Sequence, residues 1–341
     1  MTSTVKKIND VEVEIEGEIS ADVFEKHRNA AIQKISSEIT IDGFRKGHIP
    51  EKILIERVGE ITILEAMAER ALEEAYPTII LEHAIDAIGR PTISLTKIAA
   101  KNPLGFKIKQ AILPKITLPD YKKIAASVGK EFTGKTIEVL GEEIENILTR
   151  LRTERKKDPK DETEIAPALD DAFVQTLGDF KTVDDLKTKI GENLKFEKTI
   201  QERDKKRSKI VESLIEKTKI TLPDVLVDRE AHALVHELQS NIAQLGISFE
   251  DYLKQAKKTE TDLIKESRPQ AEKRVAMGLI LDEIAKQEKI VISPEELETE
   301  TQKVIAMYQG ADAGAARNYV EGILKNERVF KLLEETTTSK E

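Results

Sequence analysis

The sequence predicts a multidomain protein in which an α+β domain is followed by an extended, all-helical region. Strand-like and helix-like patterns alternate over the first 119 residues, whereas nearly every segment after residue 168 has helical periodicity. Charged residues make up 34% of the 341 residues and aromatic residues only 4%, which is typical of long helices with much solvated surface. We therefore expect domains at 1–119 and 168–341, joined by a linking region at 120–167.

The segment 1–119 begins with alternating residues, in which Val11, Val13 and Ile15 share one face and glutamates the other. Period two with one charged face predicts a single half-buried strand. Ser20 is expected to cap a helix that ends near residue 38. The other elements expected here are helices at 51–58 and 60–87, a break at 89–91, and strands at 92–100 and 104–118.

The linking region at 120–167 has three expected parts. No clear period runs through 120–139, where we expect extended chain. An amphipathic stripe then predicts a helix at 140–157, which is followed by a short polar break at 158–167.

The region after residue 168 is predicted to be almost wholly helical, with a frayed tail after about residue 335. Four helix starts match the capping box, in which a hydroxyl accepts a first-turn amide and an acid three residues later reaches back. The four capping hydroxyls are those of Thr182, Ser248, Thr259 and Ser293. The expected helices are 168–178, 183–218, 223–244, 249–256, 260–288, 294–308 and 314–334.

Charge and cysteine content exclude several classes of protein. The formal net charge of −9 argues against a general nucleic-acid binder, so any contact with RNA must come from a local basic patch. The absence of cysteine excludes disulfides, a cysteine nucleophile and thiolate metal sites. The first residues lack the apolar run of a signal peptide, and no run of about 18 apolar residues occurs, so we expect no membrane span and a cytoplasmic location.

Signatures of catalysis are missing from the sequence. Neither the phosphate-binding G-x-x-x-x-G-K-[ST] nor G-x-G-x-x-G is present. His232 and His236 have the spacing of a zinc protease, but Ala233 stands where the general base belongs, so an exposed helix face is the favoured interpretation. We expect no catalytic residue, no metal and no cofactor.

The stretch DGFRKGHIPEKI, residues 42–53, is the strongest candidate for a functional site. Its two glycines allow positive φ on either side of an aromatic residue and two cations, and its proline fixes the start of the next helix. One interpretation is an ordinary turn with the aromatic ring tucked inward. The other is a raised tip that docks onto a phosphate-rich surface. The site residues are Gly43, Phe44, Arg45, Lys46, Gly47 and Pro50.

The octapeptide GFRKGHIP resembles the GFRxGxxP signature of the trigger factor family, bacterial chaperones that sit at the ribosomal exit. The opening EVEIEGEISADVFEKHRNAAIQKISSEITI also resembles the family's first domain. ALDDAFVQTLGDFKTVDDLKTKIGENL, ITLPDVLVDREAHALVHEL and RPQAEKRVAMGLILDEIAKQEKIVISPEELETE resemble successive pieces of its helical domain. The resemblance covers nearly the whole chain.

One piece of the family pattern is missing. Trigger factors usually carry a peptidyl-prolyl isomerase domain of the FK506-binding type after the first helix of the helical domain. Here only about ten residues separate the end of that helix near Lys157 from Ala168, whereas an independent domain needs about 50. We expect no isomerase domain and no proline isomerisation.

The resemblance implies docking on the large ribosomal subunit. Phe44, Arg45 and Lys46 would contact a protein beside the exit and nearby ribosomal RNA, while Gly43, Gly47 and Pro50 would shape the loop. A loop this small buries less than the roughly 1,600 Å² of a standard interface, so we expect micromolar affinity, about −8 kcal/mol, that weakens as salt rises.

The resemblance also implies that nascent and unfolded polypeptides are held without nucleotide by a helical body with two arms. The candidate client-binding residues are Val304, Ile305, Met307 and Tyr308, at a helix end where adaptable contacts suit varied clients. The cluster at 277–281 is open to a core or a client-facing interpretation. A homodimer of the free protein, and a cytoplasmic pool partly bound to ribosomes, are also implied.

Three alternatives compete with this interpretation. A protein that docks on ribosomes without holding clients would share the loop, so the loop does not separate the two. A proline isomerase is disfavoured by the missing domain. A periplasmic chaperone with similar arms is disfavoured by the missing signal peptide.

Overall fold

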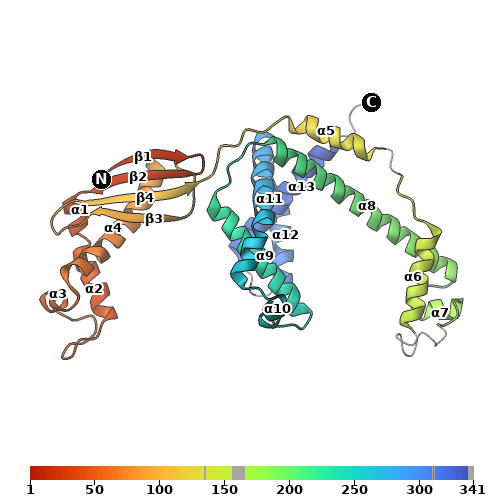
Figure 1. Cartoon of the computed structure of the whole chain (residues 1–341), viewed down its shortest axis with the longest axis horizontal. Coiled ribbons are helices and arrows are strands. Elements are labelled where there is room, and N and C mark those ends of the chain that lie inside the picture. The colour runs from red at the N-terminus through yellow and green to blue at the C-terminus, as the bar shows by residue number, and fades with distance from the viewer. Residues whose placement is uncertain (134–135, 156–165, 309, 311, 337–341) are drawn as a thin grey trace. The chain divides into compact units, whose positions relative to one another are not determined.

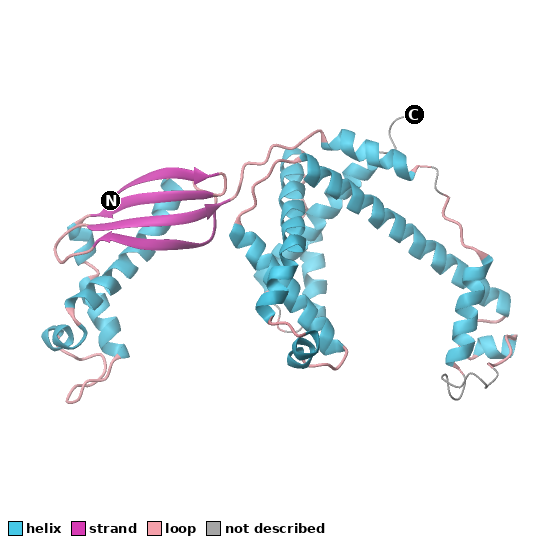
Figure 2. Cartoon of the chain, viewed as in Figure 1, coloured by secondary structure: helices cyan, strands magenta, loops and turns pink. Residues whose placement is uncertain are grey.

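The computed structural model describes residues 1–133, 136–155, 166–308, 310 and 312–336 (Figure 1). The chain divides into two compact units and passes between them at three points, one of which lies inside a helix. The first unit comprises Met1–Thr117 and Lys219–Leu279, and the second comprises Leu118–Thr218 and Ile280–Glu341. The domain boundaries expected at 119 and 167 stay a prediction. The predicted fold class is confirmed, because a four-stranded antiparallel sheet with helices is followed by a long helical region (Figure 2).

The sheet has the strand order β1-β2-β4-β3. The prediction of one opening strand was wrong, because the segment forms a hairpin. Its turn is closed where the Val11 amide donates to Asn9 Oδ1 at 2.9 Å. Asn and Asp side chains favour such turns by bonding the backbone two residues on. The strands are β1 (Thr2–Asn9), β2 (Glu12–Ile19), β3 (Ala87–Lys97) and β4 (Leu104–Ile112).

One face of this sheet forms the core of the N-terminal region. Ile15 of β2 lies opposite Ile108 of β4, and neither side chain is exposed. Apolar residues of the long fourth helix pack into the same cluster. Gly17 is required in β2, because a Cβ there would lie 2.7 Å from the Phe106 ring. The helices of this region are α1 (Ala21–Glu25), α2 (Arg28–Glu38), α3 (Glu51–Val58) and α4 (Glu60–Glu82).

Three details of this region differ from expectation. The helix expected at 20–38 is split into α1 and α2, and the Ser20 side chain makes no capping hydrogen bond. Helix α4 ends five residues early, and Ala84 takes a positive φ of 47° soon after. The break expected at 89–91 lies within β3, because Pro91 is tolerated on an edge strand where the register shifts.

The prediction of extended chain over 120–139 was also wrong for the first part of this segment, which forms helix α5 (Tyr121–Phe132). The Asp120 carboxylate accepts the Lys123 amide at 2.9 Å and caps the helix. Ile124 and Val128 are buried on one face. Short helices are stable mainly through such tertiary burial. The few apolar residues of this segment were therefore too weak a signal to predict a helix from the sequence.

The remaining helices follow the sequence expectations closely, although α7 is shorter than the range 168–178. All four predicted capping hydroxyls accept the expected amide, at 3.1–3.2 Å. The expected polar break and frayed tail lie mainly outside the described residues. The helices are α6 (Gly141–Glu154), α7 (Asp171–Gln175), α8 (Val183–Lys217), α9 (Asp224–Gln244), α10 (Phe249–Ala256), α11 (Glu260–Gln287), α12 (Pro294–Met307) and α13 (Ala313–Glu335).

A charged contact joins α8 to α13 within the second unit. Arg207 is only 14% exposed and donates to Glu334 at 2.7 Å and to Glu327 at 2.8 Å. Its guanidinium also lies 5.0 Å from the centre of the Phe330 ring, within cation–π range. None of the helices in the described parts of the chain has the length and apolar character that a membrane crossing requires.

Candidate functional site

The candidate docking loop joins α2 to α3. In Figure 1 it projects below these two helices, at the end of the N-terminal region that lies away from the sheet. Both stems of the loop are anchored, because Ile41 packs against the core and Ile49 is buried within it. Residues 42–46 between the stems are exposed. The backbone thus enters and leaves the core at fixed points and presents its middle to solvent.

Two successive tight turns shape the exposed part. The Phe44 amide donates to the Ile41 carbonyl at 3.1 Å, and the His48 amide donates to the Arg45 carbonyl at 3.0 Å. The third residue of each turn is a glycine, with φ of 86° at Gly43 and 79° at Gly47. This is the φ that a type II turn requires at its third position, where side chains are strained. The two glycines are therefore explained by backbone geometry.

The second stem is held by one residue of α2. Ser36, which is 2% exposed, accepts the Gly47 amide on its carbonyl at 2.8 Å and the Ile49 amide on Oγ at 3.2 Å. The start of α3 after Pro50 is held by Arg28, whose Nε donates to Glu51 at 2.8 Å and Nη1 to Glu60 at 2.7 Å. The hydrogen bonds to Glu60 and then Glu51 raise the pKa of the Arg28 guanidinium.

The tip of the loop carries an aromatic ring and two cations. Phe44 is 38% exposed, so its side chain is not buried in the core, although part of its surface is covered. Arg45 and Lys46 are exposed, and no ion pair joins either of them to a carboxylate among the residues that the structure describes. Both cations are therefore presented to solvent beside an accessible ring. This geometry suits a surface that offers phosphates and an apolar notch.

The four candidate client-binding residues differ in exposure. Val304 and Ile305 are half-buried, and Val304 packs against the core cluster of α12 and α13. Met307 is 79% exposed and Tyr308 is 67% exposed. The helix end thus offers two accessible side chains rather than four. In the cluster at 277–281, Ile280 and Leu281 are core residues with 1% exposure each, which settles them as packed core.

Sequence reasoning missed a second exposed apolar surface, at the junction of α9 and α10. Leu245 is 76% exposed and Ile247 is 40% exposed, on either side of a glycine with φ of 75°. Helix α10 is amphipathic, yet none of its residues is buried. Phe249 and Tyr252 stack with ring centroids 6.4 Å apart. The apolar run LGISF between two helices was the available signal.

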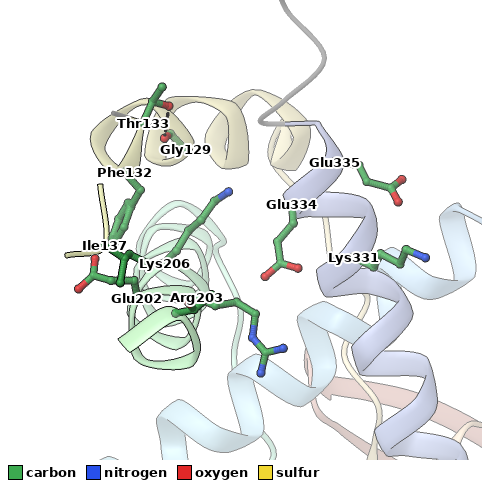
Figure 3. A pocket seen from close by; sticks show the side chains of 11 residues that line it. Gly129, Phe132, Thr133, Ile137, Glu202, Arg203, Lys206, Lys331, Glu334 and Glu335 are labelled. Carbon is green, nitrogen blue, oxygen red and sulfur yellow. Dashed lines mark hydrogen bonds between the residues drawn. The ribbon is translucent and has the colours of Figure 1, made fainter. Parts of the chain in front are cut away.

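A groove of about 630 Å³ lies within the second unit, between the end of α5, α8 and α13 (Figure 3). Phe132 and Ile137 give it an apolar wall. Three cations and three carboxylates line it, and one of these carboxylates, Glu334, already accepts hydrogen bonds from Arg207. Its charges are balanced and its walls amphipathic.

The metal interpretation of the histidine pair gains no support. His232 Nδ1 lies 2.7 Å from the Asp228 carbonyl of its own helix, on an exposed face. Within the described residues no group of three or more His, Cys, Asp or Glu side chains is placed to hold a metal ion.

Comparison with known proteins places both halves of the chain. The model "Bacterial trigger factor protein (TF)" matches residues 1–151, and "Bacterial trigger factor protein (TF) C-terminus" matches residues 182–336. No isomerase domain is matched between them. The resemblance drawn from the loop and its flanking segments is thereby confirmed.

Two similar curated proteins are both trigger factors. That of Agathobacter rectalis is 24% identical over 89% of this chain and 86% of its own length, and that of Desulforamulus reducens is 26% identical over 94% and 92%. The latter alignment spans 411 positions against the 341 residues here, so at least 70 of its positions have no counterpart in this chain.

A solved chain also shares the fold. It comes from a study of promiscuous substrate recognition in folding and assembly activities of the trigger factor chaperone. It is 16% identical, covers 97% of this chain and 99% of its own, and has a TM-score of 0.53.

Proposed function

Because the chain belongs to the trigger factor family, we propose that it is an ATP-independent chaperone that docks at the ribosomal exit and holds nascent or unfolded polypeptides. One observation carries the docking half of this proposal. Two glycine turns hold Phe44, Arg45 and Lys46 outward, and neither cation is neutralised by a carboxylate of the described residues. Membership of this family supports the further proposal that the protein works in the cytoplasm, partly on ribosomes.

The docking half assigns a role to each part of the loop. Arg45 and Lys46 pair with phosphates of ribosomal RNA, while the Phe44 ring fills an apolar notch on a protein of the large subunit. A tip of this size buries too little surface for a tight complex, so the affinity is micromolar and falls with salt. Fast exchange suits a factor that must leave and return during translation.

The holding half rests on separate apolar surfaces in the helical region. One comprises Met307 and Tyr308, and the other comprises Leu245 and Ile247 with the half-buried rings of Phe249 and Tyr252. Each is small, so each binds an exposed apolar segment weakly and without a defined pocket. Release follows when the client buries its own apolar surface.

Proline isomerisation is not part of the proposed function. The matched regions leave only residues 152–181 between them, which is shorter than the roughly 50 residues that an independent domain needs. A proline-limited refolding reaction should therefore run at the same rate with and without the protein. Acceleration by catalytic amounts would contradict this part of the proposal.

The docking experiment is co-sedimentation with ribosomes. It compares the wild type with a variant carrying Phe44→Ala, Arg45→Ala and Lys46→Ala, at low and high salt. We expect the wild type to pellet at low salt and less at high salt, and the variant to stay in the supernatant. Equal pelleting of the two proteins would remove the docking assignment.

A client assay separates the chaperone from a ribosome-bound interaction protein that holds nothing. Aggregation of a chemically unfolded client is followed by light scattering, at a chaperone-to-client ratio near one. Suppression by both the wild type and the loop variant supports holding by the helical region. No suppression by either protein would leave the non-holding alternative as the better description.

A further inference from the structure

We propose that Ser36 is a positioning residue, which fixes the docking loop in its binding conformation without touching the ribosome. This inference rests on the proposed docking function. It adds a residue outside the loop whose side chain determines how much of the free protein is ready to dock.

The position of Ser36 explains how it acts. It lies two residues before the end of α2, where carbonyls lack helical donors. Its carbonyl accepts the Gly47 amide at 2.8 Å, and its side-chain Oγ accepts the Ile49 amide at 3.2 Å. One residue thus satisfies two amides of the returning stem, on either side of His48. These bonds connect the second glycine turn directly to a helix of the core.

The side-chain bond is the one that the rest of the fold cannot replace easily. Ile49 is 5% exposed and Ser36 is 2% exposed, so water does not readily reach the Ile49 amide. Alanine at position 36 would keep the carbonyl and its bond to Gly47 but leave the Ile49 amide without its acceptor. A buried amide without a partner favours loop conformations in which that stem has moved outward to water.

The effect on docking follows from populations. When only a fraction of the free protein holds the binding conformation, the apparent Kd rises in inverse proportion to that fraction. Loss of one neutral hydrogen bond changes the equilibrium between loop conformations by about fivefold, which is the largest factor by which the apparent Kd can then rise. The groups that contact the ribosome are unchanged, so the number of phosphates neutralised, and with it the salt slope, should stay the same.

The experiment compares Ser36→Ala with the neighbouring variant Ser37→Ala. Ser37 is a matched control, because its exposed hydroxyl donates only to the Lys34 carbonyl of its own helix, at 2.7 Å. Ribosome affinity is measured by titration at several salt concentrations. Amide hydrogen exchange of Ile49 is measured in the free protein, and thermal unfolding reports on the fold.

For Ser36→Ala we expect binding that is weaker by up to about fivefold, an unchanged salt slope and faster exchange at Ile49, with wild-type values for Ser37→Ala. Wild-type affinity of Ser36→Ala would overturn the inference whatever the exchange at Ile49, as would a reduced salt slope, which would mean that Ser36 makes a ribosome contact. The triple loop variant is measured alongside. If the triple variant binds like the wild type, the docking function itself is wrong. If the triple variant loses binding while Ser36→Ala binds like the wild type, only the role of Ser36 is removed.

Discussion

Replacement of Phe44 with alanine should weaken ribosome docking about 30-fold and leave the fold intact. A phenylalanine side chain has about 200 Å² of surface, and 38% of Phe44 is exposed in the free protein, so docking can bury about 80 Å² more. At about 25 cal/mol per Å² this burial contributes about 2 kcal/mol, and each 1.4 kcal/mol is a factor of ten. The salt slope should not change, since no charge is lost.

The assay is a binding titration of labelled protein with ribosomes at several salt concentrations, with thermal unfolding as a check on the fold. Leu81→Ala is a suitable control, because Leu81 is 79% exposed at the end of α4, outside the loop. We expect the control to bind like the wild type. An affinity within twofold of wild type for Phe44→Ala would refute the reasoning, because the exposed ring would then contribute no buried surface.

Three further changes test other parts of the molecule. Arg45→Ala should reduce the slope of log K against log salt by about 0.7–0.9, the value for one phosphate contact, and an unchanged slope would argue against that contact. The double change Leu245→Ser and Met307→Ser should weaken suppression of client aggregation without changing ribosome affinity. Full suppression by this variant would mean that clients bind at another surface. The hydrogen bonds from Arg207 lower the pKa of the Glu327 carboxyl, so this pair stabilises the fold above the unfolded pKa of about 4.3 and loses its effect as pH falls through the lower folded value. Arg207→Met should therefore show a shallower loss of thermal stability between pH 5 and 3, and melts with the wild-type pH dependence would contradict this.

Local patterns predicted most of the helical region. A capping hydroxyl acts on an amide three residues away, so the starts at Thr182, Ser248, Thr259 and Ser293 could be placed from the sequence and were confirmed. Three of the helices that follow them, α8, α11 and α12, also agree because their helical pattern repeats over several turns. Where the signal was short, as in α5, the helix depended on burial of its face, and the sequence did not reveal the partner.

In the docking loop, too, some features could be predicted from the sequence and others could not. Its two glycines and its proline specify backbone conformations that any reader of the sequence can assign, because those residue types have restricted or permissive φ wherever they occur. Ser36 was not predicted, because its hydrogen bonds join residues up to 13 apart across a helix end. The run LGISF between two helices was the one sequence signal for the exposure of Leu245, and the burial of Ile280 was beyond the sequence, since an apolar residue type does not show which neighbours cover it.

The sequence by itself determined the family, most of the helices after residue 168, and the glycine and proline positions that shape the loop. Each of these depends on residue type or on spacing along the chain. Only the tertiary structure decided which apolar side chains are left in solvent, how the opening segment folds back into a hairpin, and what holds the loop to the core. Those features depend on neighbours distant in sequence, and folding selects such neighbours by burying surface and satisfying amides over the whole chain at once.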